Sequence, residues 1–240
     1  MESDQLHFPA ACSRTVQSKQ TAPHSRLGQL VDKHMQRPWK APLHRPSARA
    51  CDQAFGLAAR ISNVHGLVFD SGCGTGESTR SLAKRWPDHV VFGVDRSAHR
   101  LSRTGHARFP VMERNIVWLR SELTTFWRLA LGADLHPDRH YLLYPNPSPK
   151  PAQVRRRWHA HPVFPVLVAL GGVIELRSNW NVYVEEFARA IEQACGSKPE
   201  VRTLEPAVPF TRFEQKYQAS GHTLYRLMVD LRQGGLAGAE

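Results

Sequence analysis

At 240 residues the chain suits one α/β domain with appendages, and its hydrophobic content of 41% is ordinary for a globular protein. Its net charge of +11 favours a polyanionic partner such as nucleic acid, although a basic surface that only aids solubility would give the same number. No apolar run approaches the ~20 residues of a membrane span, and four cysteines without ligand-like spacing predict no zinc site, so we expect a cytoplasmic protein without membrane contact or metal.

Residues 1–50 predict a flexible basic arm. They hold eight Lys and Arg residues against three acids, with five prolines and no sustained periodicity, so they bury too little apolar surface to order themselves. The arm could close on nucleic-acid phosphates or be no more than a solvated tail, and no export signal is recognisable in it. We expect the folded domain at 51–231, opening with a helix or turn over 51–63, and a flexible tail at 232–240.

The pattern at residues 66–86 predicts a strand, a tight turn and a helix, and the rest of the domain is built around it. The apolar run ends in Asp70, and the turn holds three glycines at alternate positions, Gly72, Gly74 and Gly76. Glycines permit positive φ angles and let a ligand approach the backbone closely. Glu77 opens the helix, where an acid would repel the phosphate that a dinucleotide places there. A cationic nucleoside without phosphate fits this turn better, and S-adenosylmethionine is such a nucleoside.

A second strand over 89–95 supports the nucleoside cofactor. It ends in Asp95, 19 residues after Gly76, where ribose hydroxyls need an acceptor. The alternative is a generic α/β turn whose glycines solve only a packing problem. The run 96–108 then carries four arginines, two histidines and no acid; on a helix it would form a basic face that contacts nucleic acid, or only a solvated face.

The next elements lead to a proline-rich loop. A strand is expected at 115–120, with Ser121 or Glu122 opening the helix that follows, and another strand at 140–144. Residues 145–151 can be neither helix nor central strand because of their prolines. Such a loop at the carboxyl end of a strand is where α/β folds bind substrates. The cations beside it are assigned to nucleic-acid phosphates: Lys150, Arg155, Arg156 and Arg157.

The last part of the chain continues the alternation of strand and helix. A short helix at 164–170 ends at a glycine pair, a strand follows at 173–178, and an amphipathic helix is expected at 182–195. The final strands, at 201–204 and 222–231, are expected to be antiparallel at one edge. Between them, residues 210–216 are either an ordinary edge turn or a substrate contact.

Four segments resemble, in order, motifs of the bacterial tRNA (guanine-N7-)-methyltransferases. They are the turn 70–76, the loop 145–150, residues 178–183, and residues 211–214 followed by Gly221 and His222. The match is collinear over about residues 64–231. The resemblance implies a class I methyltransferase fold, an α/β, Rossmann-like, doubly wound sheet that is mostly parallel with an antiparallel edge strand. It also implies S-adenosylmethionine as cofactor, tRNA as substrate and methyl transfer to N7 of guanine, at variable-loop position 46 in the family.

Carried over position by position, the resemblance implies roles for individual residues. Those around the cofactor are Asp70, Gly72, Gly74, Gly76, Asp95, Glu122 and Asn146. Those that bind the substrate are Lys150, Asn179, Thr211, Arg212, Phe213 and Glu214. Asn146 falls on the residue assigned to catalysis in the family, where the family has aspartate; Asn179 also replaces an aspartate, and Ser148 a tryptophan.

Guanine N7 has a lone pair and no proton, so methyl transfer to it needs no general base, and placement alone could supply ~7–11 kcal/mol. Asn146 could donate to the Hoogsteen edge, but an amide loses the stabilisation that a carboxylate gives the cationic product. We therefore expect an enzyme that is slower than its relatives. We also expect a monomer or a weak homodimer. The alternatives are a protein that binds cofactor and RNA without turnover, an amino-methyltransferase with an N-P-P-Y-like loop, and a methyltransferase with another RNA or small-molecule acceptor.

Overall fold

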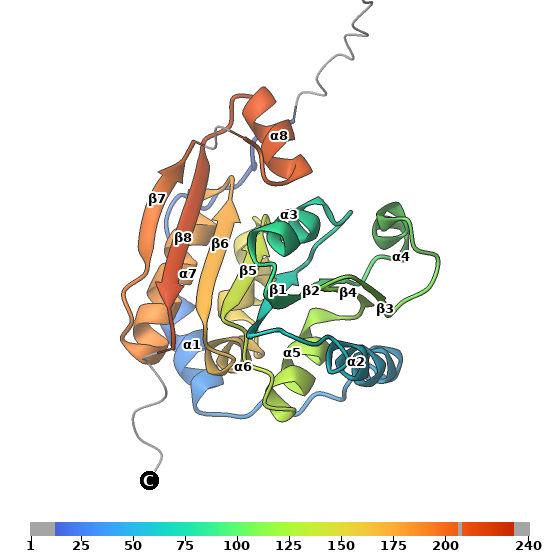
Figure 1. Cartoon of the computed structure of the whole chain (residues 1–240). Helices are drawn as coiled ribbons and strands as arrows, with labels where there is room; N and C mark the ends of the chain where they lie inside the picture. Colours follow the sequence, from blue (N-terminus) through green and yellow to red (C-terminus); the bar gives the residue numbers. More distant parts are fainter. Residues whose placement is uncertain (1–12, 206–207, 233–240) are drawn as a thin grey trace, which may run out of the picture.

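The computed structural model describes residues 13–205 and 208–232, and one eight-stranded sheet runs through it in the order β3-β4-β2-β1-β5-β6-β8-β7 (Figure 1). The parallel strands are β1 (Gly66–Ser71), β2 (His89–Asp95), β4 (Ile116–Arg120), β5 (Arg139–Leu143) and β6 (Val173–Ser178). The antiparallel pairings involve β3 (Val111–Glu113) with β4, and β8 (Leu224–Asp230) with both β6 and β7 (Glu200–Leu204). The expected mostly parallel sheet is confirmed, with the antiparallel strand β8 one position in from the edge.

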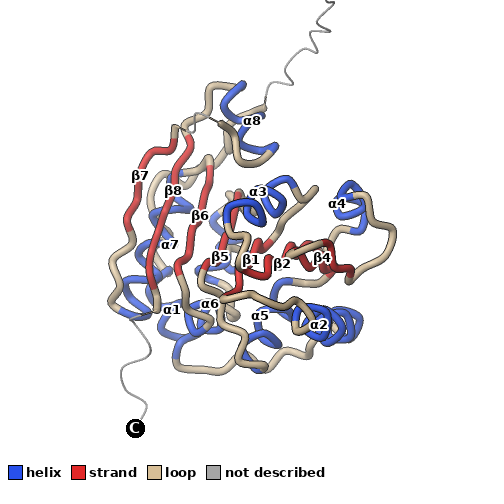
Figure 2. Tube along the Cα trace, in the orientation of Figure 1, coloured by secondary structure: helices blue, strands red, loops and turns tan. Residues whose placement is uncertain are grey.

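Helices cover both faces of the sheet, which makes the fold doubly wound (Figure 2). One face carries α1 (Leu27–Met35), α2 (Arg45–Ala58), α5 (Leu123–Gly132), α6 (Phe164–Ala169) and α7 (Asn181–Cys195). The other carries α3 (Glu77–Arg85), α4 (Ala98–Leu101) and, at the carboxyl edge of the sheet, α8 (Arg212–Ala219). Short 3-10 turns occupy Ser102–Thr104, Pro151–Arg156 and Trp158–Ala160. Within the described residues, no helix is long and apolar enough to cross a membrane.

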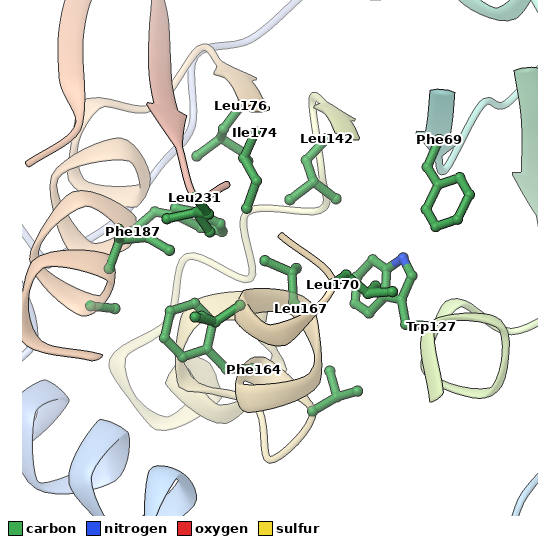
Figure 3. Packing of buried hydrophobic residues seen from close by; sticks show 14 of the residues in the cluster. Phe69, Trp127, Leu142, Phe164, Leu167, Leu170, Ile174, Leu176, Phe187 and Leu231 are labelled. Atoms are coloured by element: carbon green, nitrogen blue, oxygen red, sulfur yellow. The ribbon is translucent and has the colours of Figure 1, made fainter. Parts of the chain in front are cut away.

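Two apolar clusters lie on the two faces, and β1 shows how the sequence separates them. Successive side chains of a strand point to opposite faces, so Val68 packs in the smaller cluster and Phe69 in the larger one. Phe69 lies 5.7 Å from Phe92 and 4.8 Å from Phe126 between ring centroids. Figure 3 shows this larger cluster, in which side chains from the strands pack against the helices beneath them. Both faces of the parallel strands are therefore buried. The polar residues that could bind a ligand are those at the ends of these strands.

The prediction of a flexible basic arm is wrong for residues 13–50. Leu27, Leu30 and Val31 are buried on one side of α1, which packs against α7. Their spacing of three and four residues forms an apolar stripe that the average composition of the segment conceals. The folded domain therefore begins before residue 51, and α2 already starts at Arg45. Residues 1–12 of the predicted arm, and residues 233–240 of the predicted tail, lie outside the described residues.

The segment before α1 lies along the carboxyl edge of the sheet. Ser13 N donates to Ser220 Oγ at 2.8 Å, and Ser18 Oγ donates to the carbonyl oxygen of Pro149 at 2.6 Å. The predicted basic helix over 96–108 is shorter than expected, because α4 has four residues and a 3-10 turn follows it. The loops that follow the parallel strands all meet at this same edge, since parallel strands end on one side of a sheet.

Candidate functional site

The glycine turn after β1 has the backbone that its sequence predicts. Gly72, Gly74 and Gly76 have φ angles of 89°, 60° and 88°, a region that side chains with a Cβ rarely adopt. Gly72 N donates to the carbonyl oxygen of Val94 at 2.8 Å, which ties the turn to β2. Within the described part of the chain, a Cβ added at Gly72 or Gly74 would meet nothing within 4 Å, whereas at Gly76 it would lie 2.7 Å from the Trp118 ring. The first two glycines therefore face open space and the third serves packing.

The two kinds of glycine predict separable effects of alanine substitution. Gly76→Ala combines left-handed strain with a clash, so we expect a loss of about 2–4 kcal/mol in unfolding free energy. Gly74→Ala has the strain without a clash, and we expect a loss of about 1–2 kcal/mol together with weaker binding of S-adenosylhomocysteine. Urea unfolding and calorimetry would measure the two effects. Equal destabilisation by both variants, with binding unaffected by Gly74→Ala, would contradict this division.

Asp70 holds the turn from inside the protein. Its Oδ2 accepts hydrogen bonds from Ser78 Oγ at 2.7 Å and Thr79 Oγ1 at 2.6 Å, while its buried Oδ1 has no partner among the residues that the structure describes. Burial raises the pKa of Asp70 to about 6 even though those two hydroxyls stabilise the charged form. The unpartnered oxygen is an acceptor of the kind that a ligand donor would satisfy.

The other predicted acids follow the neighbouring strands β2 and β4. Asp95 accepts hydrogen bonds from Gly74 N at 3.0 Å and from Ser97 N at 2.8 Å, so it joins the glycine turn to the start of α4. Each of its oxygens keeps a second lone pair. Glu122 is exposed and occupies the N-cap position of α5 without capping it by its side chain. The three acids therefore lie at or just beyond the carboxyl ends of three adjacent strands.

Helix α8, which the sequence left as a turn or a substrate contact, covers the glycine turn. Thr211 caps it by accepting a hydrogen bond from Glu214 N at 3.0 Å. Glu214 is fully buried, pairs with Arg177 at 2.6 Å and accepts from Phe210 N at 2.6 Å. Its carboxylate therefore anchors α8 to β6, which is a different task from the substrate binding that the resemblance implies. Phe213 is 40% exposed.

A small cavity lies between the glycine turn and α8. Its volume is about 40 Å³, and its lining includes Gly72, Gly74, Glu77, Arg212 and Phe213. The predicted cofactor turn and substrate segment are thus brought together. The predicted cofactor and substrate residues that are not among the lining residues are Asp70, Gly76, Asp95, Glu122, Asn146, Lys150, Asn179 and Glu214. The open space over the turn, the orphaned Asp70 oxygen and the row of acids fit a cationic nucleoside. Ligand sites commonly measure ~300–1,000 Å³, so this one has to open before it binds.

The proline loop after β5 is held in an uncommon backbone conformation. Tyr144 and Ser148 have positive φ angles of 52° and 44° without being glycine. Asn146 is exposed between them, and its Oδ1 accepts a hydrogen bond from Ser148 N at 3.1 Å. The amide also offers its NH₂ donor to a ligand, and its oxygen keeps a second lone pair. Lys150, at the end of the loop, is exposed.

Asn179 follows β6, and its amide group lies beside the ring of His222. The hydrogen bonds of that ring show which of its nitrogens carries the proton. His222 Nε2 lies 2.8 Å from the carbonyl oxygen of Ser13, which can only accept, so this nitrogen carries the proton. The neutral ring then accepts at Nδ1 from Asn179 Nδ2, 3.2 Å away. An aspartate at 179 could not donate here. The amide that departs from the family motif therefore links β6 to the segment before α1.

The prediction of RNA phosphate contacts is wrong for one of the three arginines. Arg155 and Arg156 are exposed, but Arg157 is fully buried. Its Nη1 pairs with Glu186 Oε2 at 2.5 Å, and its Nε and Nη2 donate to the carbonyl oxygen of Ser148 at 3.3 and 3.2 Å. Its guanidinium therefore supports the proline loop from behind. A run of like charges gives no signal that one member points inward.

Glu186, which is not among the predicted site residues, joins this support to the segment before α1. Its Oε1 accepts from Gln20 Nε2 at 2.7 Å and His24 N at 2.8 Å, and its Oε2 also contacts His159 Nε2 at 2.8 Å. Burial would raise the pKa of Glu186, but its hydrogen bonds from His159 and Arg157 outweigh burial and lower it to about 2. An acid on the apolar face of α7 was the available signal, because acids are rarely buried without partners.

Comparison with known proteins places these observations in a family. A family model described as "Putative methyltransferase" matches residues 65–227. A tRNA (guanine-N(7)-)-methyltransferase of Nocardioides sp. is 26% identical over 218 residues, covering 84% of this chain and 83% of the relative. One of Aquifex aeolicus is 25% identical over 174 residues, covering 71% of this chain and 58% of the relative. These matches confirm the resemblance seen in the motifs.

A solved structure supports the fold. The crystal structure of the 16S rRNA methyltransferase KamB aligns with a TM-score of 0.53 at 18% identity, covering 75% of this chain and 93% of that one. At this identity the likeness concerns the fold alone, and it confirms the expected Rossmann-like methyltransferase sheet.

Proposed function

The chain belongs to the methyltransferase family whose model spans residues 65–227, and on that premise we propose that it transfers the methyl group of S-adenosylmethionine to N7 of a guanine in tRNA. The observation that carries the proposal is the placement of the glycine turn and of the Asn146 loop at the ends of β1 and β5, which are paired strands. A tRNA substrate implies a cytoplasmic location. The curated relatives named above carry the same activity in their descriptions.

Four residues of the chain have separate roles in this proposed reaction. When bound, the cofactor supplies a methyl group on a positively charged sulfur. Asp70 and Asp95 fix the glycine turn, and Asp70 keeps one acceptor for the ligand. Glu122 offers an exposed carboxylate at the end of the next strand for a nucleoside donor. Asn146 offers an NH₂ donor, which suits the O6 acceptor of guanine and leaves N7 as the nucleophile.

The experiment that tests the proposal uses purified protein, tritiated S-adenosylmethionine and unmodified tRNA. We expect label in 7-methylguanosine after nuclease digestion, above a blank without enzyme. A comparison with ribosomal RNA and with small acids as acceptors distinguishes the substrate class. Label in another nucleoside, or transfer to another acceptor in preference to tRNA, would overturn the assignment of guanine N7.

The exposed arginines beside the proline loop predict a salt-dependent effect on RNA binding. Replacing Arg155 and Arg156 together by glutamine should weaken tRNA binding uniformly across sequences and reduce the slope of log affinity against log salt by roughly 2. The matched control replaces Arg60 and Lys84, which are exposed and precede β1 and β2 at the opposite edge of the sheet. A filter-binding series in increasing salt measures both. If the two pairs lower the slope equally, the basic surface is not specific to this edge.

A binding protein without turnover is the second candidate, and the amide at Asn146 favours it. Such a protein would bind S-adenosylhomocysteine and tRNA but transfer no label. The amide would then hold the proline loop through Ser148, and no group would stabilise a cationic product.

A further inference from the structure

An ion pair closes the cavity over the glycine turn. Arg212 Nε, on the first residue of α8, lies 2.5 Å from Glu77 Oε1, on the first residue of α3. Glu77 Oε2 also accepts a hydrogen bond from Thr75 Oγ1. Both charged groups line the cavity of about 40 Å³, so one end of a ligand bound at the glycine turn would lie beside them.

The part that can move is the pair of side chains and not the helix. Glu214 fixes α8 through its buried pair with Arg177, and Arg177 Nε in turn donates to Glu175 at 2.7 Å. By contrast, the Arg212 and Glu77 side chains are 62% and 39% exposed. An exposed ion pair of this kind contributes little to stability and is readily exchanged for other partners. The backbone of Arg212 is therefore fixed above the turn while its guanidinium can turn away.

The charges of this pair match the amino-acid end of the proposed cofactor. The methionine part of S-adenosylmethionine carries an α-carboxylate and an α-ammonium, which are the complements of a guanidinium and a carboxylate. We propose that Arg212 binds the α-carboxylate and Glu77 the α-ammonium, so that binding exchanges one ion pair within the protein for two with the ligand. This inference rests on the proposed function and assigns Arg212 to the cofactor, whereas the family motif places it at the substrate.

Two further observations agree with this exchange. Gly72 and Gly74 leave open space beside the pair, so a ligand chain can pass over the backbone to reach it. The pKa of Glu77 is lowered, because hydrogen bonds from Thr75 and Arg212 outweigh the effect of its burial, so the carboxylate stays charged at neutral pH. The same carboxylate would repel a phosphate group at this position.

Calorimetry with two ligands tests the proposal without relying on turnover. S-adenosylhomocysteine carries both amino-acid charges, and 5′-methylthioadenosine carries neither. We expect Arg212→Gln to weaken S-adenosylhomocysteine binding by roughly 10- to 100-fold and to leave methylthioadenosine unchanged. Glu77→Gln should act in the same direction, and Arg212→Lys, which keeps the charge but loses the planar fork, should fall between. Because both side chains are partly exposed, these variants are expected to fold.

The control is Arg202→Gln, which removes another exposed arginine that pairs with a glutamate, on β7. It should bind both ligands as the unmodified protein does. Unchanged S-adenosylhomocysteine affinity in Arg212→Gln, with or without weaker tRNA binding, would overturn the assignment to the cofactor. Equal weakening of both ligands would overturn it too, because the side chain would then act through pocket shape. If the unmodified protein binds neither ligand, the proposed function itself fails.

Discussion

Replacing Asn146 by aspartate should raise the rate of methyl transfer to guanine by about 10- to 100-fold. Methylation of N7 leaves a positive charge on the base, and a carboxylate in an ordered site stabilises such a charge more than an amide does. An aspartate can accept the Ser148 N–H with one oxygen, as Asn146 does at 3.1 Å, and present the other to the base. The gain belongs to the chemical step, so it appears in single-turnover experiments with saturating cofactor and tRNA.

The matched control for this gain is Asn63→Asp. Asn63 is exposed and precedes β1 at the opposite edge of the sheet, so it adds the same charge away from the proline loop. It should leave the rate unchanged. If Asn146→Asp also leaves the rate unchanged, while S-adenosylhomocysteine and tRNA still bind, the slow-enzyme interpretation is contradicted and the binding protein is favoured.

Removing the buried guanidinium of Arg157 should destabilise the protein by about 3–5 kcal/mol. The substitution Arg157→Gln leaves Glu186 charged and without the guanidinium that pairs with it at 2.5 Å, and an uncompensated buried charge has an effect of this size. Arg156→Gln, one residue earlier and exposed, should change the free energy of unfolding by no more than about 0.5 kcal/mol. Urea unfolding measures both. Equal small changes in the two variants would show that the buried pair is not needed for folding.

The same pair predicts how stability depends on pH. The pKa of Glu186 is about 2 in the folded protein and 4.5 in its ordinary state, so the folded protein favours the charged form. The stability that Glu186 contributes is therefore complete above pH 4.5 and is lost as the pH falls towards 2. In Glu186→Gln this part of the acid dependence should disappear. An unchanged acid dependence in that variant would contradict the lowered pKa.

The strands were predictable because each is a short apolar run that ends at a polar or glycine-rich turn. The runs at 66–70, 89–95 and 173–178 fall on β1, β2 and β6. Strand β3 was missed because three residues are too few to reveal a period and none of the three is buried. Helix α1 was missed because its buried stripe sits among cations and prolines, which dominate the composition.

Parts of the candidate site were predictable because the local backbone conformation requires a particular residue. Other parts were not predictable, because the role of a residue depends on partners that are distant in the sequence. Positive φ angles demanded Gly72, Gly74 and Gly76, and their spacing gave the turn directly. The roles of Arg157 and Glu214 depend on partners 29 and 37 residues away, Glu186 and Arg177, which no local pattern pairs with them. Charge predicted RNA phosphates as the partner of Arg157, and the resemblance predicted substrate binding for Glu214, but both side chains are buried.

The contacts of the segment before α1 also set the order in which the chain can complete its fold during synthesis. Glu186 receives hydrogen bonds from Gln20 and His24, which precede it by 166 and 162 residues. At about 5–20 residues per second, a ribosome takes roughly 8–30 s to make the intervening chain. Throughout that interval the apolar side of α1 has no α7 to cover it. The proline loop therefore acquires its final support only after most of the polypeptide has been synthesised.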